Sequence, residues 1–180
     1  PEGSIDKPQF EWLKLVLATN TNKHIMVFSH HTAGTMTNRL RVTGLDVRQR
    51  ILGPAVLTEL HKYPNVVAWV NGHTHRNQII AQKRFLKPGF WEINTASHVD
   101  FPQQSRIIEL VDNKDGTLSI FTTMVDHAGP ASHGGSLGDN VALSALAREL
   151  SANDPQDRTS NRTGAVADRN VELLVANALA

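Results

Sequence analysis

The first 75 residues alternate twice between a stretch with helical spacing and a short apolar run. Between Phe10 and Thr19 apolar residues recur on one helical face, which predicts an amphipathic helix. A second helix is predicted from Pro54 to about Tyr63. The apolar runs at 24–31 and at Val66–Val70 predict buried strands. The order helix, strand, helix, strand favours right-handed crossovers and parallel pairing of the two strands.

Beyond residue 75 the pattern changes to strands without intervening helices. Residues 113–116, Asn-Lys-Asp-Gly, predict a hairpin turn, and the alternation of apolar residues on either side of it favours antiparallel pairing. We therefore expect an α/β (α+β) protein with parallel strands first and an antiparallel meander after. The strands expected in this part are 77–82, 90–95, 106–112 and 117–125.

The last third of the chain has a different composition. Residues 128–138 are rich in Gly, Ser, Pro and Ala, as in flexible linkers. Two short helices are expected after them, one capped by Asp139 and one capped by Asp168 with Val171, Leu174 and Val175 facing inward. The predicted organisation is a domain at 1–127, a linker at 128–138 and a helical tail at 139–180.

Composition limits the classes of function. The chain has 180 residues, 40% of them hydrophobic, and no apolar run long enough for a membrane span or signal peptide. A formal charge of +1 offers no general attraction for nucleic acid, which makes a nucleic-acid partner unlikely, and nothing here indicates a cellular compartment. Because cysteine is absent, any metal must be held by nitrogen and oxygen, which draws attention to the nine histidines.

Histidines follow both predicted parallel strands. His30 and His31 come directly after the first strand, and His73 and His75 follow the second after Asn-Gly. Open α/β sheets bind ligands beyond the carboxyl ends of their strands, and neutral imidazole is a common metal ligand. The agreement in residue type and position predicts a shared metal site, against the alternative of polar loops that contain histidine by chance.

Several further side chains could contact an anionic substrate near that site. The long connection 32–53 carries Arg39 and Arg41, and arginine binds phosphate through paired hydrogen bonds. His98 and Arg106 lie in the loop or strand start after residues 90–96. For each of them taken singly, a solvated or structural role is the simpler interpretation.

The two histidine blocks carry a resemblance to a known family. Val-Phe-Ser-His30-His31 followed by Val-Asn-Gly-His73-Thr-His75 resembles the last two signature blocks of the calcineurin-like metallophosphoesterase superfamily. The resemblance covers roughly residues 10–127. It implies the C-terminal half of a β-sandwich flanked by helices, with a binuclear centre of Mn, Fe or Zn at its edge.

The resemblance also implies roles for the histidines. His30 and His73 would bind the second metal and His75 the first, with His31 as a neighbour. His31 is the candidate for a catalytic role. The expected activity is hydrolysis of a phosphomonoester or phosphodiester by hydroxide generated between two metals.

The family's earlier blocks, Asp-x-His, Gly-Asp-x-x-Asp and Gly-Asn-His-Asp/Glu, have no counterpart in this sequence. Histidines alone cannot hold two metals in the required geometry, so we expect a missing N-terminal half to be a partner and these residues alone to be inactive. The alternative is a non-catalytic phosphoesterase-like binding or structural module. A metallo-β-lactamase type is disfavoured, because Arg76-Asn77-Gln78 stands where that type has Asp-His.

Overall fold

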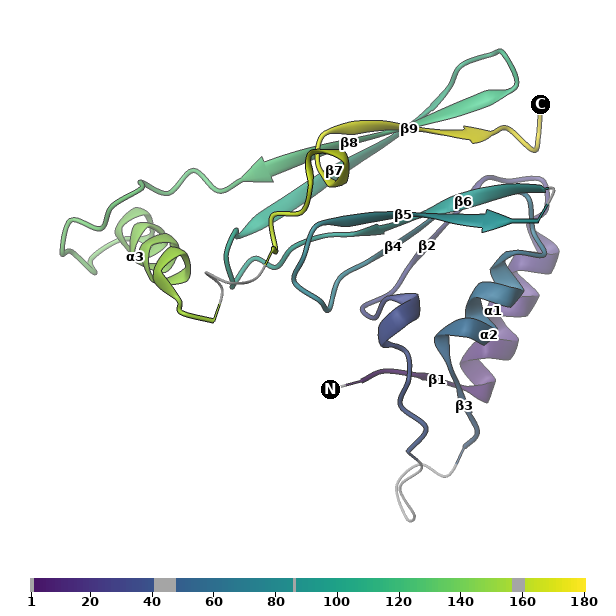
Figure 1. The fold of residues 1–180 in the computed structure, drawn as a ribbon, viewed down its shortest axis with the longest axis horizontal. Helices are drawn as coiled ribbons and strands as arrows, with labels where there is room; N and C mark the ends of the chain where they lie inside the picture. Colours follow the sequence, from purple (N-terminus) through teal and green to yellow (C-terminus); the bar gives the residue numbers. More distant parts are fainter. Residues whose placement is uncertain (1, 41–47, 86, 157–160) are drawn as a thin grey trace.

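The protein has a mixed α/β fold, seen in a computed structural model that describes residues 2–40, 48–85, 87–156 and 161–180 (Figure 1). None of the described helices is long and apolar enough to cross a membrane. In chain order the described elements are β1 (Ile5–Asp6), α1 (Lys7–Thr19), β2 (Ile25–Phe28), the 3-10 turn η1 (Ala33–Thr35), β3 (Arg50–Ile51), α2 (Gly53–Leu60), β4 (Val66–Asn71), β5 (Gln78–Arg84), β6 (Lys87–Asn94), β7 (Gln104–Asp112), β8 (Thr117–Asp126), α3 (Asn140–Asn153), the 3-10 turn η2 (Val166–Asp168) and β9 (Val171–Ala176).

The first two helices form where the sequence predicts them. Helix α1 begins after Asp6, whose carboxylate accepts a hydrogen bond from the Gln9 amide at 2.9 Å. That bond satisfies one of the amides left free at a helix start. Helix α2 has Pro54 in its first turn and ends at Leu60, three residues before the predicted end at Tyr63.

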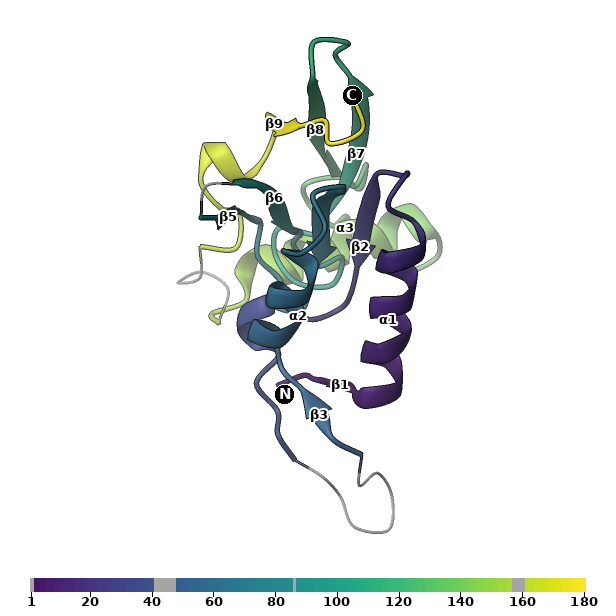
Figure 2. The same cartoon turned by 90° about the vertical axis from the view of Figure 1, so that its right-hand side faces the viewer.

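A mixed sheet of order β2-β4-β6-β5 forms the centre of the molecule. Its two edge strands, β2 and β5, lie on opposite sides of β6 in Figure 2. Strands β2 and β4 are parallel, which confirms the pairing expected from the helical crossover between them. Strand β6 is parallel to β4 and antiparallel to β5. The carboxyl ends of β2 and β4 therefore lie side by side at one edge of the sheet.

Helices and a second sheet cover the two faces of this central sheet. Helices α1 and α2 lie on one face, and the antiparallel sheet β7-β8-β9 lies on the other (Figure 1). Apolar burial accounts for both contacts. The helix-side core contains Leu17, Val56, Leu60, Val66, Trp69 and Phe90, and the core between the sheets contains Val67, Ala68, Ile93, Leu118, Ile120, Leu173 and Val175.

A buried polar cluster lies among the helix-side residues of the central sheet. Glu92 on β6 is only 3% exposed, and its carboxylate accepts hydrogen bonds from Asn71 Nδ2 and the Ala33 amide, each at 2.9 Å. Gln82 Nε2 donates to its other oxygen at 2.5 Å. Asn94 Nδ2 in turn donates to Asn71 Oδ1 at 2.8 Å. A buried carboxylate is tolerated here because both of its oxygens are hydrogen-bonded.

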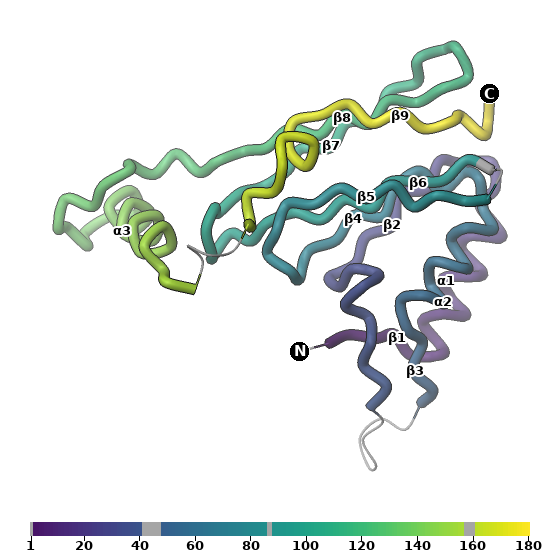
Figure 3. Tube along the Cα trace, viewed as in Figure 1, coloured from purple at the N-terminus to yellow at the C-terminus, as the bar shows by residue number. Residues whose placement is uncertain are grey.

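The tail departs from its predicted structure. Helix α3 forms, with the Asp139 carboxylate capping the Ala142 amide at 2.8 Å. The second predicted helix is wrong, because Val171–Ala176 is strand β9, paired antiparallel with β8 (Figure 3). The tail is thus helical only in its first part, and its end contributes a strand to the sheet of the preceding segment. Residues 128–138 contain no helix or strand, as their composition predicts.

Candidate metal centre

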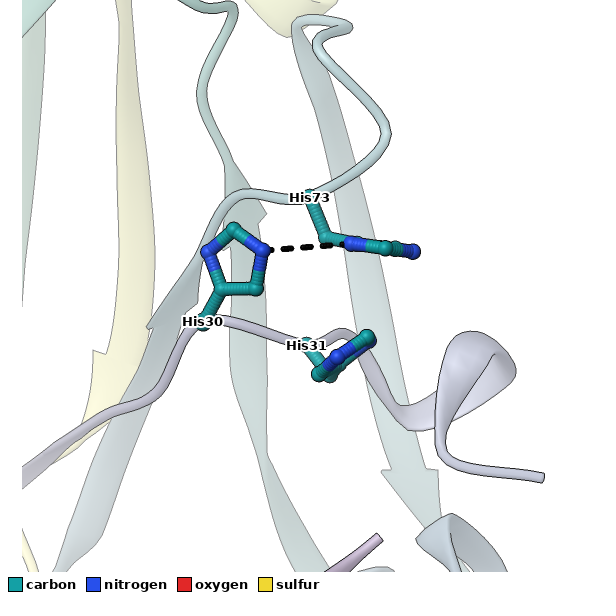
Figure 4. Close-up of side chains that lie close together, drawn as sticks. All are labelled: His30, His31 and His73. Atoms are coloured by element: carbon teal, nitrogen blue, oxygen red, sulfur yellow. Dashed lines mark hydrogen bonds between the residues drawn. The ribbon is translucent and has the colours of Figure 1, made fainter. Parts of the chain in front are cut away.

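The pairing of β2 with β4 brings His30 and His73 together. Beyond the strands the ladder continues, because the Ser29 amide donates to the Val70 carbonyl at 3.1 Å and the Gly72 amide to the His30 carbonyl at 3.0 Å. His73 follows Gly72 directly, and its Nδ1 lies 3.2 Å from His30 Nε2 (Figure 4). The structure therefore brings these two predicted ligands side by side.

His31 is the third member of the group. Its ring centroid lies 3.9 Å from that of His73, and ligand nitrogens of His30, His31 and His73 all lie within 4.8 Å of one another (Figure 4). Thr35 Oγ1 lies 3.2 Å from His31 Nδ1. Gly3 packs against the ring, where an added Cβ would lie 2.2 Å from Cδ2 and 2.6 Å from Nε2. His31, expected as a neighbour of the ligands, thus lies in one group with His30 and His73.

The electrostatics around His31 and His73 favour neutral imidazoles. Burial lowers the pKa of His31 from 6.5, and the nearby His30 lowers it further. Burial likewise lowers the pKa of His73, with added repulsion from His31 and His30. A neutral imidazole offers a lone pair to a metal ion, so near neutral pH these rings are in the form that binds cations.

His75 takes a different position. It and His73 have left-handed backbones, with φ of 54° and 67°, and among the described residues His75 is not a member of the three-histidine group. Its Nδ1 forms a hydrogen bond with the carboxylate of Asp100, which also accepts one from Arg162 at 2.6 Å. The His75 hydrogen bond is the main cause that lowers the pKa of Asp100, and Arg162 adds to it. The convergence of His75 with His30 and His73 stays a prediction.

The group of three histidines could hold one divalent ion. Nitrogens that share a zinc ion at about 2.0–2.1 Å lie at most about 4 Å apart, so small side-chain rotations would bring the three nitrogens to coordinating distance. In the part of the chain that the structure describes, no carboxylate belongs to this group. A second ion would need further ligands, because carboxylates commonly bridge or complete such sites.

The candidate substrate-binding residues that the structure describes differ in their exposure and in their hydrogen bonds. Arg39 is exposed after η1, and Arg41 lies outside the described residues. His98 is exposed, and its Nε2 lies 2.8 Å from Ser105 Oγ. Arg106 donates hydrogen bonds to the carbonyls of Asp168 at 2.7 Å and Arg169 at 3.0 Å, so it has a structural role, and its substrate contact stays a prediction.

A depression opens beside the histidine loops. It has a volume of about 630 Å³, and its lining includes Ser29 and Gly72, the residues that precede His30 and His73. His98 and Ser105 also line it. Arg106 lines it too, so two of the sequence-predicted substrate-binding residues, His98 and Arg106, face the same depression.

Two residues of the site were missed by the sequence interpretation. Asp100 was not singled out, although it is an acidic residue in the loop after a predicted strand, a position from which carboxylates often reach a site. Arg162 lies 62 positions further along the chain, in a segment that offers no such signal. Their contacts depend on tertiary structure.

Comparison with models of protein families finds none that matches the chain, and comparison with curated proteins finds no similar sequence. The functional argument therefore rests on the residues and on the geometry of the site.

Proposed function

We propose that the chain forms part of a metal-dependent phosphoester hydrolase, in which His30, His31 and His73 hold a divalent Mn, Fe or Zn ion. The proposal is carried by one observation, the convergence of three imidazoles at the carboxyl ends of two parallel strands. The resemblance of the two histidine blocks to metallophosphoesterases supplies the reaction type. The lowered pKa values of His31 and His73 support it, because they keep these nitrogens free to coordinate.

In this proposal, different residues of the chain would bind the metal ion and the ester. The three imidazoles would hold the ion, and the depression lined by His98 and Arg106 would receive the ester. A divalent ion at such a site lowers the pKa of water and neutralises charge on phosphoryl oxygens. The family's centre has two ions, and the ligands of a second one would come from the polypeptide that carries the earlier signature blocks.

A metal titration tests the first part of the proposal. Isothermal titration of the 180-residue chain with zinc or manganese chloride is expected to give one high-affinity ion per chain. His30→Ala and His73→Ala are expected to weaken binding by about 100-fold or more. His133→Ala is the matched control, since His133 lies outside the group and its backbone amide bonds Glu149. Equal affinity of wild type and His73→Ala would refute this site.

Phosphate binding and turnover test the second part. Inorganic phosphate is expected to bind the metal-loaded chain and not the metal-free chain, because the ion supplies the positive charge. Turnover of an aryl phosphodiester by these 180 residues is expected to equal that of His73→Ala, and to appear when the polypeptide with the earlier blocks is added. Phosphate binding that is unaffected by the metal, or loaded protein that never turns over with its complement, would favour a non-catalytic module.

A further inference from the structure

His75, Asp100 and Arg162 meet from three separate segments of the chain. His75 follows β4, Asp100 lies between β6 and β7, and Arg162 precedes η2 in the tail. The same oxygen of Asp100, Oδ2, contacts both His75 Nδ1 and Arg162 Nη1. Their side chains are 37%, 33% and 22% exposed, so the bonds are partly shielded from water and less screened than on an open surface.

Backbone contacts hold the tail in place beside His75. The Asn77 amide donates to the Arg162 carbonyl at 2.8 Å, and Asn77 is fully buried. Gly164 approaches the same residue so closely that a Cβ would lie 2.4 Å from the Asn77 carbonyl oxygen. The position of Arg162 is thus fixed relative to a residue only two places beyond His75.

The contact with Asp100 determines which ring nitrogen of His75 keeps a free lone pair. A carboxylate accepts hydrogen bonds, so the bond favours the tautomer with the proton on Nδ1 and leaves the lone pair on Nε2. The described residues offer Nε2 no hydrogen bond. Arg162 holds the carboxylate by a charge-assisted bond, which limits rotation of Asp100.

We propose that Asp100 and Arg162 are positioning residues for His75, which fix its imidazole so that Nε2 can bind a divalent ion. The tail is then part of the site, through Arg162. The use of Nε2 as a ligand rests on the proposed function and adds His75 to the three ligands named there, whereas the fixing of the tautomer does not depend on that function.

The tautomer can be measured without any metal. Long-range ¹H–¹⁵N spectra of the full metal-free chain, recorded above the pKa of imidazole and assigned with His75→Asn, are expected to show His75 protonated on Nδ1. Asp100→Asn brings an amide that can donate to Nδ1, so the Nε2-protonated form is expected to increase. Arg162→Ala should give a mixture, and Arg162→Lys should restore most of the wild-type form.

Asp126→Asn is the matched control for the carboxylate, because Asp126 accepts from Gln104 and does not contact His75. It is expected to leave the His75 spectrum unchanged. A wild-type His75 that carries its proton on Nε2, or the same tautomer populations in wild type and Asp100→Asn, would overturn the inference. If Asp100→Asn fails to fold, Arg162→Ala carries the test, and wild-type tautomer populations in that variant would overturn the role of Arg162.

A zinc titration followed at His75 tests the ligand role. Zinc chloride is expected to shift the His75 Nε2 resonance in the wild type, and Asp100→Asn should raise the zinc concentration for half of that shift by about 10–100-fold. If zinc moves His73 and leaves His75 unchanged, the ligand role is wrong although the proposed function stands. If zinc moves neither, the proposed function fails, and the tautomer measurement still judges the roles of Asp100 and Arg162.

Discussion

His73 Nδ1 lies 3.2 Å from His30 Nε2, although 43 positions separate the two residues in the sequence. Two adjacent parallel strands that end at the same level produce this contact, because each delivers its next residues to the same sheet edge. The proposed metal site therefore depends on sheet pairing, so changes that disturb the loops after β2 and β4 are expected to change metal affinity.

Chelation should reverse any stabilisation by metal. Because an ion that binds only the folded state stabilises it by mass action, saturating zinc is expected to raise the melting temperature of the chain, and EDTA should return it to the metal-free value. Differential scanning calorimetry measures both. His30→Ala should show no such rise. A rise in that variant equal to the wild type would mean that the stabilising ion binds elsewhere.

Gly3→Ala is expected to weaken metal binding. Its new Cβ would lie 2.2 Å from His31 Cδ2, so the imidazole must move away from its present position. We expect a loss of affinity of about tenfold, the effect of displacing a positioned ligand. Zinc titration calorimetry measures it. Gly34→Ala is the control on the same side of the site, since its Cβ would meet only Thr32 Oγ1 at 3.8 Å, and an equal loss there would exclude the steric explanation.

Arg106→Met is expected to destabilise the fold. Burial lowers the Arg106 pKa to about 10, and its guanidinium joins β7 to carbonyls at the start of the tail segment before β9. Removing it leaves buried acceptors without a donor, which costs about 3 kcal/mol in the free energy of unfolding. Urea denaturation measures this loss. Arg39→Met, at an exposed arginine, should change stability by less than about 0.5 kcal/mol.

The pH dependence of stability should include a contribution from His61. Burial against the ring of Phe90, 5.2 Å away between centroids, lowers the His61 pKa from 6.5, and Arg84 lowers it further. Between the lowered pKa and 6.5 the folded state therefore binds fewer protons than the unfolded state. The free energy of unfolding should decrease as the pH falls through this window.

Urea denaturation at a series of pH values measures that contribution. His61→Phe removes the titrating group, so its stability is expected to fall less steeply with decreasing pH than that of the wild type. The remaining histidines are present in both proteins, and their effects cancel in the comparison. Parallel curves for the two proteins would show that the pKa of His61 is not lowered in the folded state.

The periodic parts of the fold could be predicted from the sequence, and the tail strand could not. Residues 171–176 are nearly all apolar, so Val171, Leu174 and Val175 fit a helical face as well as a strand. The strand forms because β8 offers it a partner. Asp168 looked like a helix cap, yet its carboxylate accepts from the Ile79 amide at 2.8 Å, a contact across 89 positions.

The candidate site, like the fold, could be predicted only where it follows from local sequence patterns. His30 and His73 could be placed together because strand order and strand ends follow from local patterns. The inclusion of His31 depends on side-chain direction after β2, and the partners of His75 depend on how the loop at 100 and the tail fold back. Neither is encoded in spacing along the chain.

The carboxylate of Glu92 disfavours a wrong pairing register between β4 and β6 in the central sheet. The apolar residues of β4 and β6 would pair almost as well if one strand slid by a single position, because a slide exchanges one apolar face for the other. Such a slide would turn the Glu92 side chain into the apolar core between the two sheets. It would also remove the carboxylate from the amides that now donate to it, which would lower the free energy of unfolding by several kcal/mol. A single acidic side chain thus disfavours the shifted register, which the apolar residues around it would tolerate.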